Sequence, residues 1–293
     1  MLIYCILSVI GIFVGWFISR WVDYLTPVPE STSTKLILQF RIRVMFVTGL
    51  LFALLPYAII EQGSQQALPE VQQNEFWWWG RVVFQLMLIT LLVAATATDL
   101  REYIIHDATI LPGILIAFVA ATASGHLQMM HLWIDWSQQI EGLRGPYIPQ
   151  WIAENQHWHG LAVTVAGGVM GAGVTWLVRV TSSLILGKES LGLGDVTLMA
   201  MIGSFLGWQP VMFVFLFAPA CGIIMGAIVW LGSRKNYIPF GPSLCAGAIV
   251  VLFSWHWLWR ETRLVFGHPP SLLMLAGVAW GALVLLLARL PQL

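Results

Sequence analysis

Two aspartates stand at the borders of apolar stretches, and together they could perform acid–base chemistry. Asp195 follows a Gly-Leu-Gly tripeptide and opens the apolar run that begins at Val196, whereas Asp99 ends an earlier apolar run. Because Asp99 lies at the C-terminal end of its expected helix, it cannot be an N-terminal cap. A carboxylate there also faces the negative end of the helix dipole, which is unfavourable and requires another explanation. Two carboxylates within hydrogen-bonding distance cannot both ionise, so one keeps a proton while the other acts as a base. If the two side chains meet, they can activate water and protonate an amide leaving group, which predicts aspartic proteolysis without a metal or an organic cofactor.

Residues close to the two aspartates are candidates for supporting roles. Gly192 and Gly194 precede Asp195, and we expect them to give the backbone a tight, positive-φ turn beside it. Asp107 precedes the next apolar run and is well placed as the N-cap of the helix that follows. His106 puts a titratable ring next to Asp107, where it is either a residue that tunes the site or an ordinary interfacial histidine.

The composition is typical of a chain that folds in lipid. Hydrophobic residues make up 58% of the chain and charged residues 10%, and the zero net charge gives no indication of nucleic acid binding. The three cysteines lie singly, which excludes a disulfide framework and a paired-cysteine zinc site. We therefore expect an all-α polytopic membrane protein with about nine transmembrane helices, the one after Asp195 being short, at roughly 2–19, 40–60, 82–98, 108–123, 160–180, 196–208, 211–232, 242–259 and 271–288.

The Lys and Arg residues predict the orientation of these spans. With the N-terminus outside and the C-terminus in the cytoplasm, ten of the 14 Lys and Arg residues fall on the cytoplasmic side and four outside. Asp99 and Asp195 then both lie at cytoplasmic helix ends. The outer segments 61–80 and 124–159, the latter with His157 and His159, are expected to be solvated loops.

Small residues predict where helices approach each other closely. Gly167 and Gly171 are four residues apart, and Gly222 and Gly226 repeat the spacing. Such pairs allow the backbones of two membrane helices to come into contact. We expect a packing role for them and no ligand.

The segment around Asp195 resembles the GxGD motif of the bacterial prepilin peptidases, which are membrane aspartic proteases. Asp99 is similar to the first catalytic aspartate of that family, because a second Asp follows eight residues later and a Pro five residues after that. The start of the chain matches the family segment GSFLNVVIYR in part, and a late segment resembles the IPFGP signature of the family. The matching positions are Gly11, Phe13, Ile18, Arg20, Asp99, Asp107, Pro112, Gly192, Gly194, Asp195, Leu198, Ala200, Gly203, Leu206 to Trp208, and Ile238 to Pro242.

This resemblance implies a function. Asp99 and Asp195 would be the catalytic pair, and the backbone at Gly192 and Gly194 would approach an extended substrate. The reaction would remove the leader peptide of type IV prepilins or type II secretion pseudopilins at the cytoplasmic face of a bacterial inner membrane. The implied partners are the lipid bilayer and single-span pilin-like precursors, with no nucleic acid and no metal or other cofactor.

The resemblance also divides the chain into parts. Residues 1–80 would be an N-terminal two-helix anchor region with a shortened cytoplasmic loop, and residues 81–293 the prepilin-peptidase-like protease domain, the two forming one integrated membrane domain. In long members of the family, a cytoplasmic domain with two CxxC pairs joins the first two spans and is associated with methylation of the new N-terminus. The corresponding interval here, about residues 21–39, has no cysteine. We therefore expect cleavage without N-methyltransferase activity.

Departures from the family pattern leave alternatives open. Thr197 stands where the family usually has Lys, which changes how the substrate or the pair is held, and His106 replaces a Pro, which removes a rigid turn. The loss of the Lys, together with Gly15 in place of the usual Asn, favours slightly a catalytically degenerate relative that acts as a membrane assembly factor. A presenilin-like intramembrane protease fits less well, because Thr98 replaces the Tyr of its YD motif and the late signature is not PAL. A transporter or channel ranks last, since no internal repeat is visible.

Overall fold

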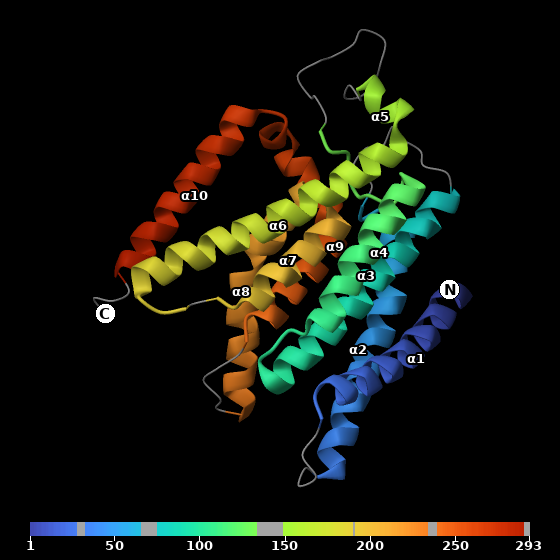
Figure 1. Ribbon diagram of the computed structural model, residues 1–293. Helices are drawn as coiled ribbons and strands as arrows, with labels where there is room; N and C mark the ends of the chain where they lie inside the picture. Colours follow the sequence, from blue (N-terminus) through green and yellow to red (C-terminus); the bar gives the residue numbers. More distant parts are fainter. Residues whose placement is uncertain (28–32, 66–74, 134–148, 190, 234–238, 290–293) are drawn as a thin grey trace.

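The computed structural model describes residues 1–27, 33–65, 75–133, 149–189, 191–233 and 239–289. These residues form ten helices and no strand (Figure 1). The helices are α1 (Leu2–Leu25), α2 (Thr34–Ile60), α3 (Glu75–Glu102), α4 (Asp107–Ser124), α5 (Gln150–Glu154), α6 (Gln156–Leu186), α7 (Leu193–Leu206), α8 (Trp208–Ser233), α9 (Gly241–Phe266) and α10 (Pro269–Arg289). The predicted all-α fold is confirmed for this part of the chain.

Seven of the described helices are long and apolar enough to cross a membrane, namely α1, α2, α3, α4, α6, α8 and α9. Helix α7 and the Pro269–Leu285 part of α10 are apolar but shorter. The prediction of a multi-pass membrane protein is therefore confirmed. The count of nine spans and the orientation of the termini stay predictions.

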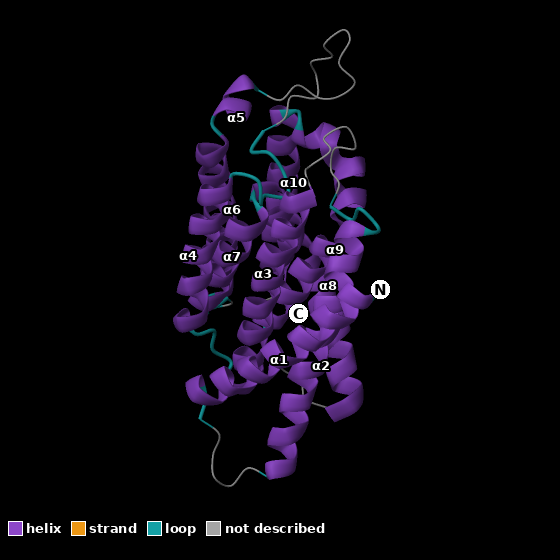
Figure 2. Cartoon of the chain, turned by 90° about the vertical axis from the view of Figure 1, so that its right-hand side faces the viewer, coloured by secondary structure: helices purple, strands orange, loops and turns teal. Residues whose placement is uncertain are grey.

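Helix α3 is the central helix of the bundle. The α1–α2 hairpin packs along one side of it and α4 and α7 along another, while α9 contacts it from a third (Figures 1 and 2). Leu88, Ile89 and Leu92 on α3 are completely buried. Asp99, in the last turn of α3, is thus carried by a helix that is held on several sides.

Helix α7 is short, and its neighbours cover most of it. Leu198, Met199, Met201 and Ile202 have no exposed surface, although the helix has only 14 residues. A helix that is enclosed by protein does not need to match the thickness of the hydrocarbon core. Helix α7 is therefore an internal element, and Asp195 lies in its first turn.

The contact between α6 and α7 has no room for side chains. A Cβ atom on Gly167 would overlap the carbonyl oxygen of Gly203, and a Cβ on Gly203 would overlap the carbonyl oxygen of Gly167. Gly171 packs in the same way against the backbone of Met199. The predicted packing role of Gly167 and Gly171 is confirmed, and the contact fixes the position of α7.

We expect Gly167→Ala to destabilise the protein by about 1–3 kcal/mol, because the new methyl group forces the two backbones apart. Gly173→Ala on the same helix is the matched control, since a Cβ there has no neighbour within 4 Å. Alanine is the better helix former, so the control is expected to be neutral or more stable. Denaturant titration of the detergent-solubilised protein measures both changes, and equal stability of the two variants would contradict the tight α6–α7 contact.

The end of the bundle at which α6 begins is closed by polar contacts to the segment 125–133. The backbone N–H of Leu132 donates to His159 Nε2 at 3.0 Å, and Trp208 Nε1 donates to the Leu132 carbonyl at 2.7 Å. Burial, with a smaller contribution from Arg81, lowers the pKa of His131 in this segment to about 4. The prediction that His159 is a loop residue is wrong, because α6 begins at Gln156 and His159 is buried under the segment.

Candidate active site

Asp99 and Asp195 come together where α3, α7 and α9 meet. Only 4% of Asp99 and 9% of Asp195 is exposed, and the two carboxylates lie within electrostatic range of each other. They are far apart in the sequence, and the packing of α3 against α7 joins them. The fold therefore places the two aspartates at the same junction of helices, and their use as a catalytic pair stays a prediction.

The N-terminus of α7 holds Asp195. Its Oδ2 atom accepts a hydrogen bond from the backbone N–H of Gly192 at 3.1 Å, as a carboxylate in the first turn of a helix often does. The positive end of the α7 dipole also favours a negative charge at this position. Asp195 is thus a helix-capping residue, and its Oδ1 atom has no recorded hydrogen bond among the described residues.

The expected positive φ at the two glycines is wrong. Gly192 has φ −73° and ψ 156°, which is ordinary extended backbone, and Gly194 lies inside the first turn of α7. The lack of a side chain is used differently at Gly194, where a Cβ would lie 3.2 Å from Cβ of Ile105. Gly194 therefore allows α7 to approach the chain that follows Asp99.

The start of α9 holds Asp99. The backbone N–H of Gly241, the first residue of α9, donates a hydrogen bond to the Asp99 carboxylate. A Cβ at this position would overlap Asp99 Oδ2, so no other residue fits without moving the carboxylate. Each aspartate thus faces the N-terminal end of a helix, and the two dipoles offset part of the repulsion between like charges.

A tight turn after Asp99 completes the site. Tyr103 has φ 59°, a left-handed conformation that is uncommon for a bulky residue, and its N–H donates to the Asp99 carbonyl at 3.0 Å. This turn directs Ile105 toward the site, where its side chain packs against Gly194 and Gly241. The sequence reasoning missed Ile105. Gly241, in contrast, belongs to a motif that had been recognised without a structural role.

The other candidate residues lie at the edge of the site. Asp107 is exposed and is the first residue of α4, so the prediction that it is the N-cap is wrong; His106 occupies that position. His106 Nε2 lies 3.8 Å from Glu102 Oε2, and Thr197 Oγ1 donates to the Gly194 carbonyl at 3.1 Å. Among the described residues, no hydrogen bond or ion pair joins Asp107, His106 or Thr197 to either carboxylate.

An ion-pair cluster joins the N-terminal hairpin to the end of α3. Asp23 on α1 pairs with Arg41 on α2 at 2.6 Å and with Arg101 on α3 at 2.7 Å. Arg101 also stacks on the ring of Phe40, with 3.9 Å from Cζ to the ring centroid. Because Arg101 follows Asp99 by two residues, the cluster fixes the α1–α2 hairpin beside the site. Within the described ranges, no three His, Cys, Asp or Glu residues gather closely enough to hold a metal ion.

Comparison with known proteins identifies the relatives of this chain. The model of the type IV leader peptidase family matches residues 150–231, which include Asp195 and helices α5 to α7 with most of α8. No solved structure matches the chain. The resemblance recognised from the motifs is confirmed by this match and by the curated relatives.

Three curated relatives carry the name prepilin leader peptidase/N-methyltransferase. That of Aeromonas salmonicida is 30% identical over 180 residues, which cover 60% of this chain and 50% of the relative. That of Pseudomonas putida is 30% identical over 185 residues, covering 61% and 53%, and that of Escherichia coli K12 is 36% identical over 96 residues, covering 32% and 43%. The chain spans about half the length of the first two relatives.

Proposed function

We propose that this chain is a membrane aspartic endopeptidase that removes the leader peptide from type IV prepilin or pseudopilin-like precursors. The observation that carries the proposal is the buried pair of Asp99 and Asp195, each held by the backbone N–H of a glycine. The similarity to leader peptidases, whose family match includes one of the two aspartates, supplies the substrate class. The proposal places both aspartates at the cytoplasmic face of the bacterial inner membrane.

The proposed reaction uses the two carboxylates as an acid–base pair. The ionised carboxylate takes a proton from a water molecule, and the resulting hydroxide attacks the carbonyl carbon of the scissile peptide bond. The protonated carboxylic acid donates a hydrogen bond to the carbonyl oxygen as negative charge develops on it. Proton transfer to the amide nitrogen then breaks the C–N bond and releases the leader with a new carboxylate and the mature protein with a new amine. Which aspartate carries the proton is a property of the pair.

The proposal is limited to cleavage. The names of the relatives also state N-methyl transfer, but the interval between α1 and α2 carries none of the cysteines that the resemblance associates with that activity. The Asp23 cluster suggests a different role for this part of the chain, because it joins α1 and α2 directly to the helix that carries Asp99.

Cleavage of precursors in membranes tests the proposed function. Membranes that contain the intact chain are expected to convert at least one pilin-like or pseudopilin-like precursor to a shorter product, with a new N-terminus at the leader junction by mass spectrometry. The double variant Asp99→Asn/Asp195→Asn is the negative control and must insert in the membrane at the same level. Failure to cleave any member of a broad set of precursors would favour the degenerate assembly factor over the protease.

A further inference from the structure

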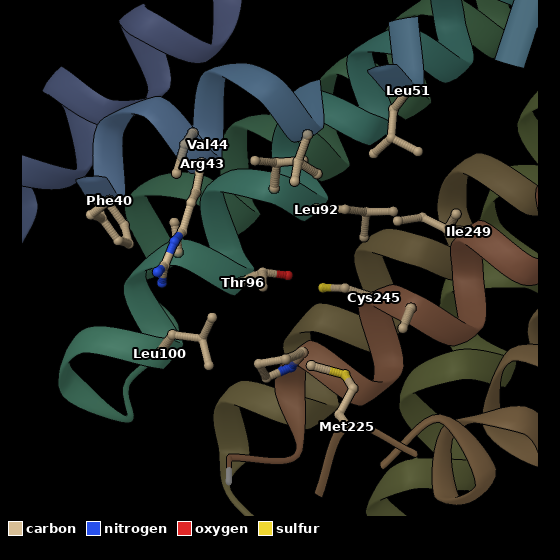
Figure 3. A pocket seen from close by; sticks show the side chains of 15 residues that line it. Phe40, Arg43, Val44, Leu51, Leu92, Thr96, Leu100, Met225, Cys245 and Ile249 are labelled. Atoms are coloured by element: carbon tan, nitrogen blue, oxygen red, sulfur yellow. The ribbon is translucent and has the colours of Figure 1, made fainter. Parts of the chain in front are cut away.

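An apolar cavity of about 310 Å³ lies between α2, α3 and α9, with Met225 of α8 on its lining (Figure 3). Its walls include Phe40, Val47 and Leu51 on α2, Leu100 on α3 and Ile249 on α9. Figure 3 shows Phe40, Leu51, Leu100 and Ile249 arranged around a common space, with the Arg43 guanidinium at one end. Helix α2 of the N-terminal hairpin therefore forms one wall of the cavity, and α3 and α9, which hold Asp99, form most of the rest.

The cavity adjoins the aspartate pair. Thr96, Ala97 and Leu100 line it from α3 and lie within one turn of Asp99. Pro242 lines it from α9 and directly follows Gly241, whose N–H holds the Asp99 carboxylate. Cys245, buried on the inner wall, contacts Thr96 and lies within electrostatic range of both aspartates. One wall of the cavity is thus the back of the candidate active site.

The cavity also reaches the outer surface of the bundle. Val47 and Leu100 line it and are 45% and 48% exposed, and both belong to helices long and apolar enough to span the membrane. Along α2 it extends from Phe40 to Leu51, which corresponds to about 16 Å at the rise of an α-helix. Side chains from the bilayer can therefore enter it without passing through water.

The size of the cavity limits what can occupy it. An apolar cavity of about 150 Å³ holds one benzene molecule, so this one can hold about two side chains of that size. A complete helix, with a diameter of about 10–12 Å, does not fit inside. The occupant must lie along the opening and insert apolar side chains from one face, as helices do in hydrophobic grooves.

Resting on the proposed function, we propose that this cavity docks the membrane-embedded apolar segment of the precursor. The segment approaches sideways from the bilayer, inserts about two apolar side chains between α2 and the α3–α9 pair, and so holds the adjoining peptide bond beside Asp99 and Asp195. Continuity with the aspartates favours this occupant over a lipid acyl chain, which has no reason to end at the back of a catalytic pair. Residues 1–80 then contribute to substrate binding through α2 as well as anchoring the chain.

Photo-crosslinking tests the docking independently of cleavage. A benzophenone amino acid is placed at Val47 or Ile249 in the cavity, and at Leu50 or Val250 as matched controls, which are exposed on the same helices and do not line it. The background is Asp99→Asn/Asp195→Asn, so that uncleaved precursor accumulates. The yield of adducts with the precursor is expected to be at least about fivefold higher from the two cavity positions than from the two control positions. Equal yields from all four positions, or adducts with phospholipid alone from the cavity, would overturn the docking proposal.

A kinetic test separates docking from catalysis. Ala246→Phe fills part of the cavity, and Val250→Phe places the same final side chain outside it on the same helix. The cavity variant is expected to raise KM for the full precursor at least about tenfold with little change in kcat, whereas the control changes neither. If the intact chain cleaves the precursor and Ala246→Phe behaves as Val250→Phe does, the docking proposal is wrong while the proposed function stands. If no precursor is cleaved but the cavity positions crosslink to the precursor, the docking proposal stands and the proposed protease function is wrong.

Discussion

Replacement of either Asp99 or Asp195 by Asn is expected to reduce the rate of precursor cleavage by about 10³-fold or more. General acid–base catalysis by a positioned side chain contributes about 10²–10⁴-fold, and residues that act as one unit lose most of their effect when either is removed. Asn has the shape of Asp and keeps an oxygen that can accept from the N–H of Gly192 or Gly241, so the packing should survive. Single-turnover cleavage in membranes measures the loss for each variant.

Asp107→Asn is the matched control for this experiment. Asp107 belongs to the same sequence motif as Asp99, but it is exposed at the start of α4. Removal of its charge costs at most its interaction with the helix dipole, about 0.3–1 kcal/mol of stability, and we expect less than about a fivefold effect on cleavage. A variant of Asp99 or Asp195 that cleaves as fast as Asp107→Asn would show that the two aspartates are not a catalytic pair.

Gly241→Ala is expected to lower kcat for precursor cleavage by about 10²-fold, because displacement of a catalytic group by about 1 Å has an effect of that size. The added methyl group would overlap Asp99 Oδ2 and come within 3.0 Å of Ile105 Cδ1, so the carboxylate must move away from the backbone N–H that holds it. The loss of activity is expected in kcat more than in KM, because the added methyl group faces the Asp99 carboxylate and not a surface that binds the substrate.

Gly226→Ala on α8 controls for the general effect of adding a methyl group to a helical glycine. A Cβ at Gly226 has no neighbour within 4 Å, so the close packing that the spacing predicted at this glycine is wrong. Alanine favours the helix by about 1 kcal/mol over glycine. Cleavage by this variant is expected to match that of the unchanged chain. If Gly241→Ala and Gly226→Ala cleave equally well, Gly241 does not position Asp99.

Local features of the sequence were sufficient to predict the fold class, one close helix contact and the two candidate acids. The high apolar content predicted a helical membrane protein, because apolar side chains leave water whatever their partners are. The spacing of Gly167 and Gly171 predicted a close helix contact, which the structure confirms. Asp99 and Asp195 attracted attention because an acid in an apolar stretch needs an explanation. The motif resemblance added a similarity to the prepilin peptidases, which the comparisons confirm.

The errors concern places where the chain changes direction. Helix α4 begins at Asp107 rather than after it, α6 begins early enough to bury His159, and Gly192 is extended rather than left-handed. Some of these helix ends are capped locally, as Gly192 is by Asp195, but they also pack against segments that are distant in the sequence. Trp208, for example, holds Leu132, and Gly194 makes room for Ile105.

The sequence by itself determined that the chain is a helical, multi-pass membrane protein, and it indicated which two acids could do chemistry. Only the tertiary structure decided that Asp99, Asp195 and Gly241 share one site and that α2 forms a wall of the adjoining cavity. The physical reason is that hydrophobicity and helical periodicity act along a single segment. The distances between α3, α7 and α9 arise instead from complementary packing, in which glycines permit contact at some points and buried leucines and methionines fill the rest.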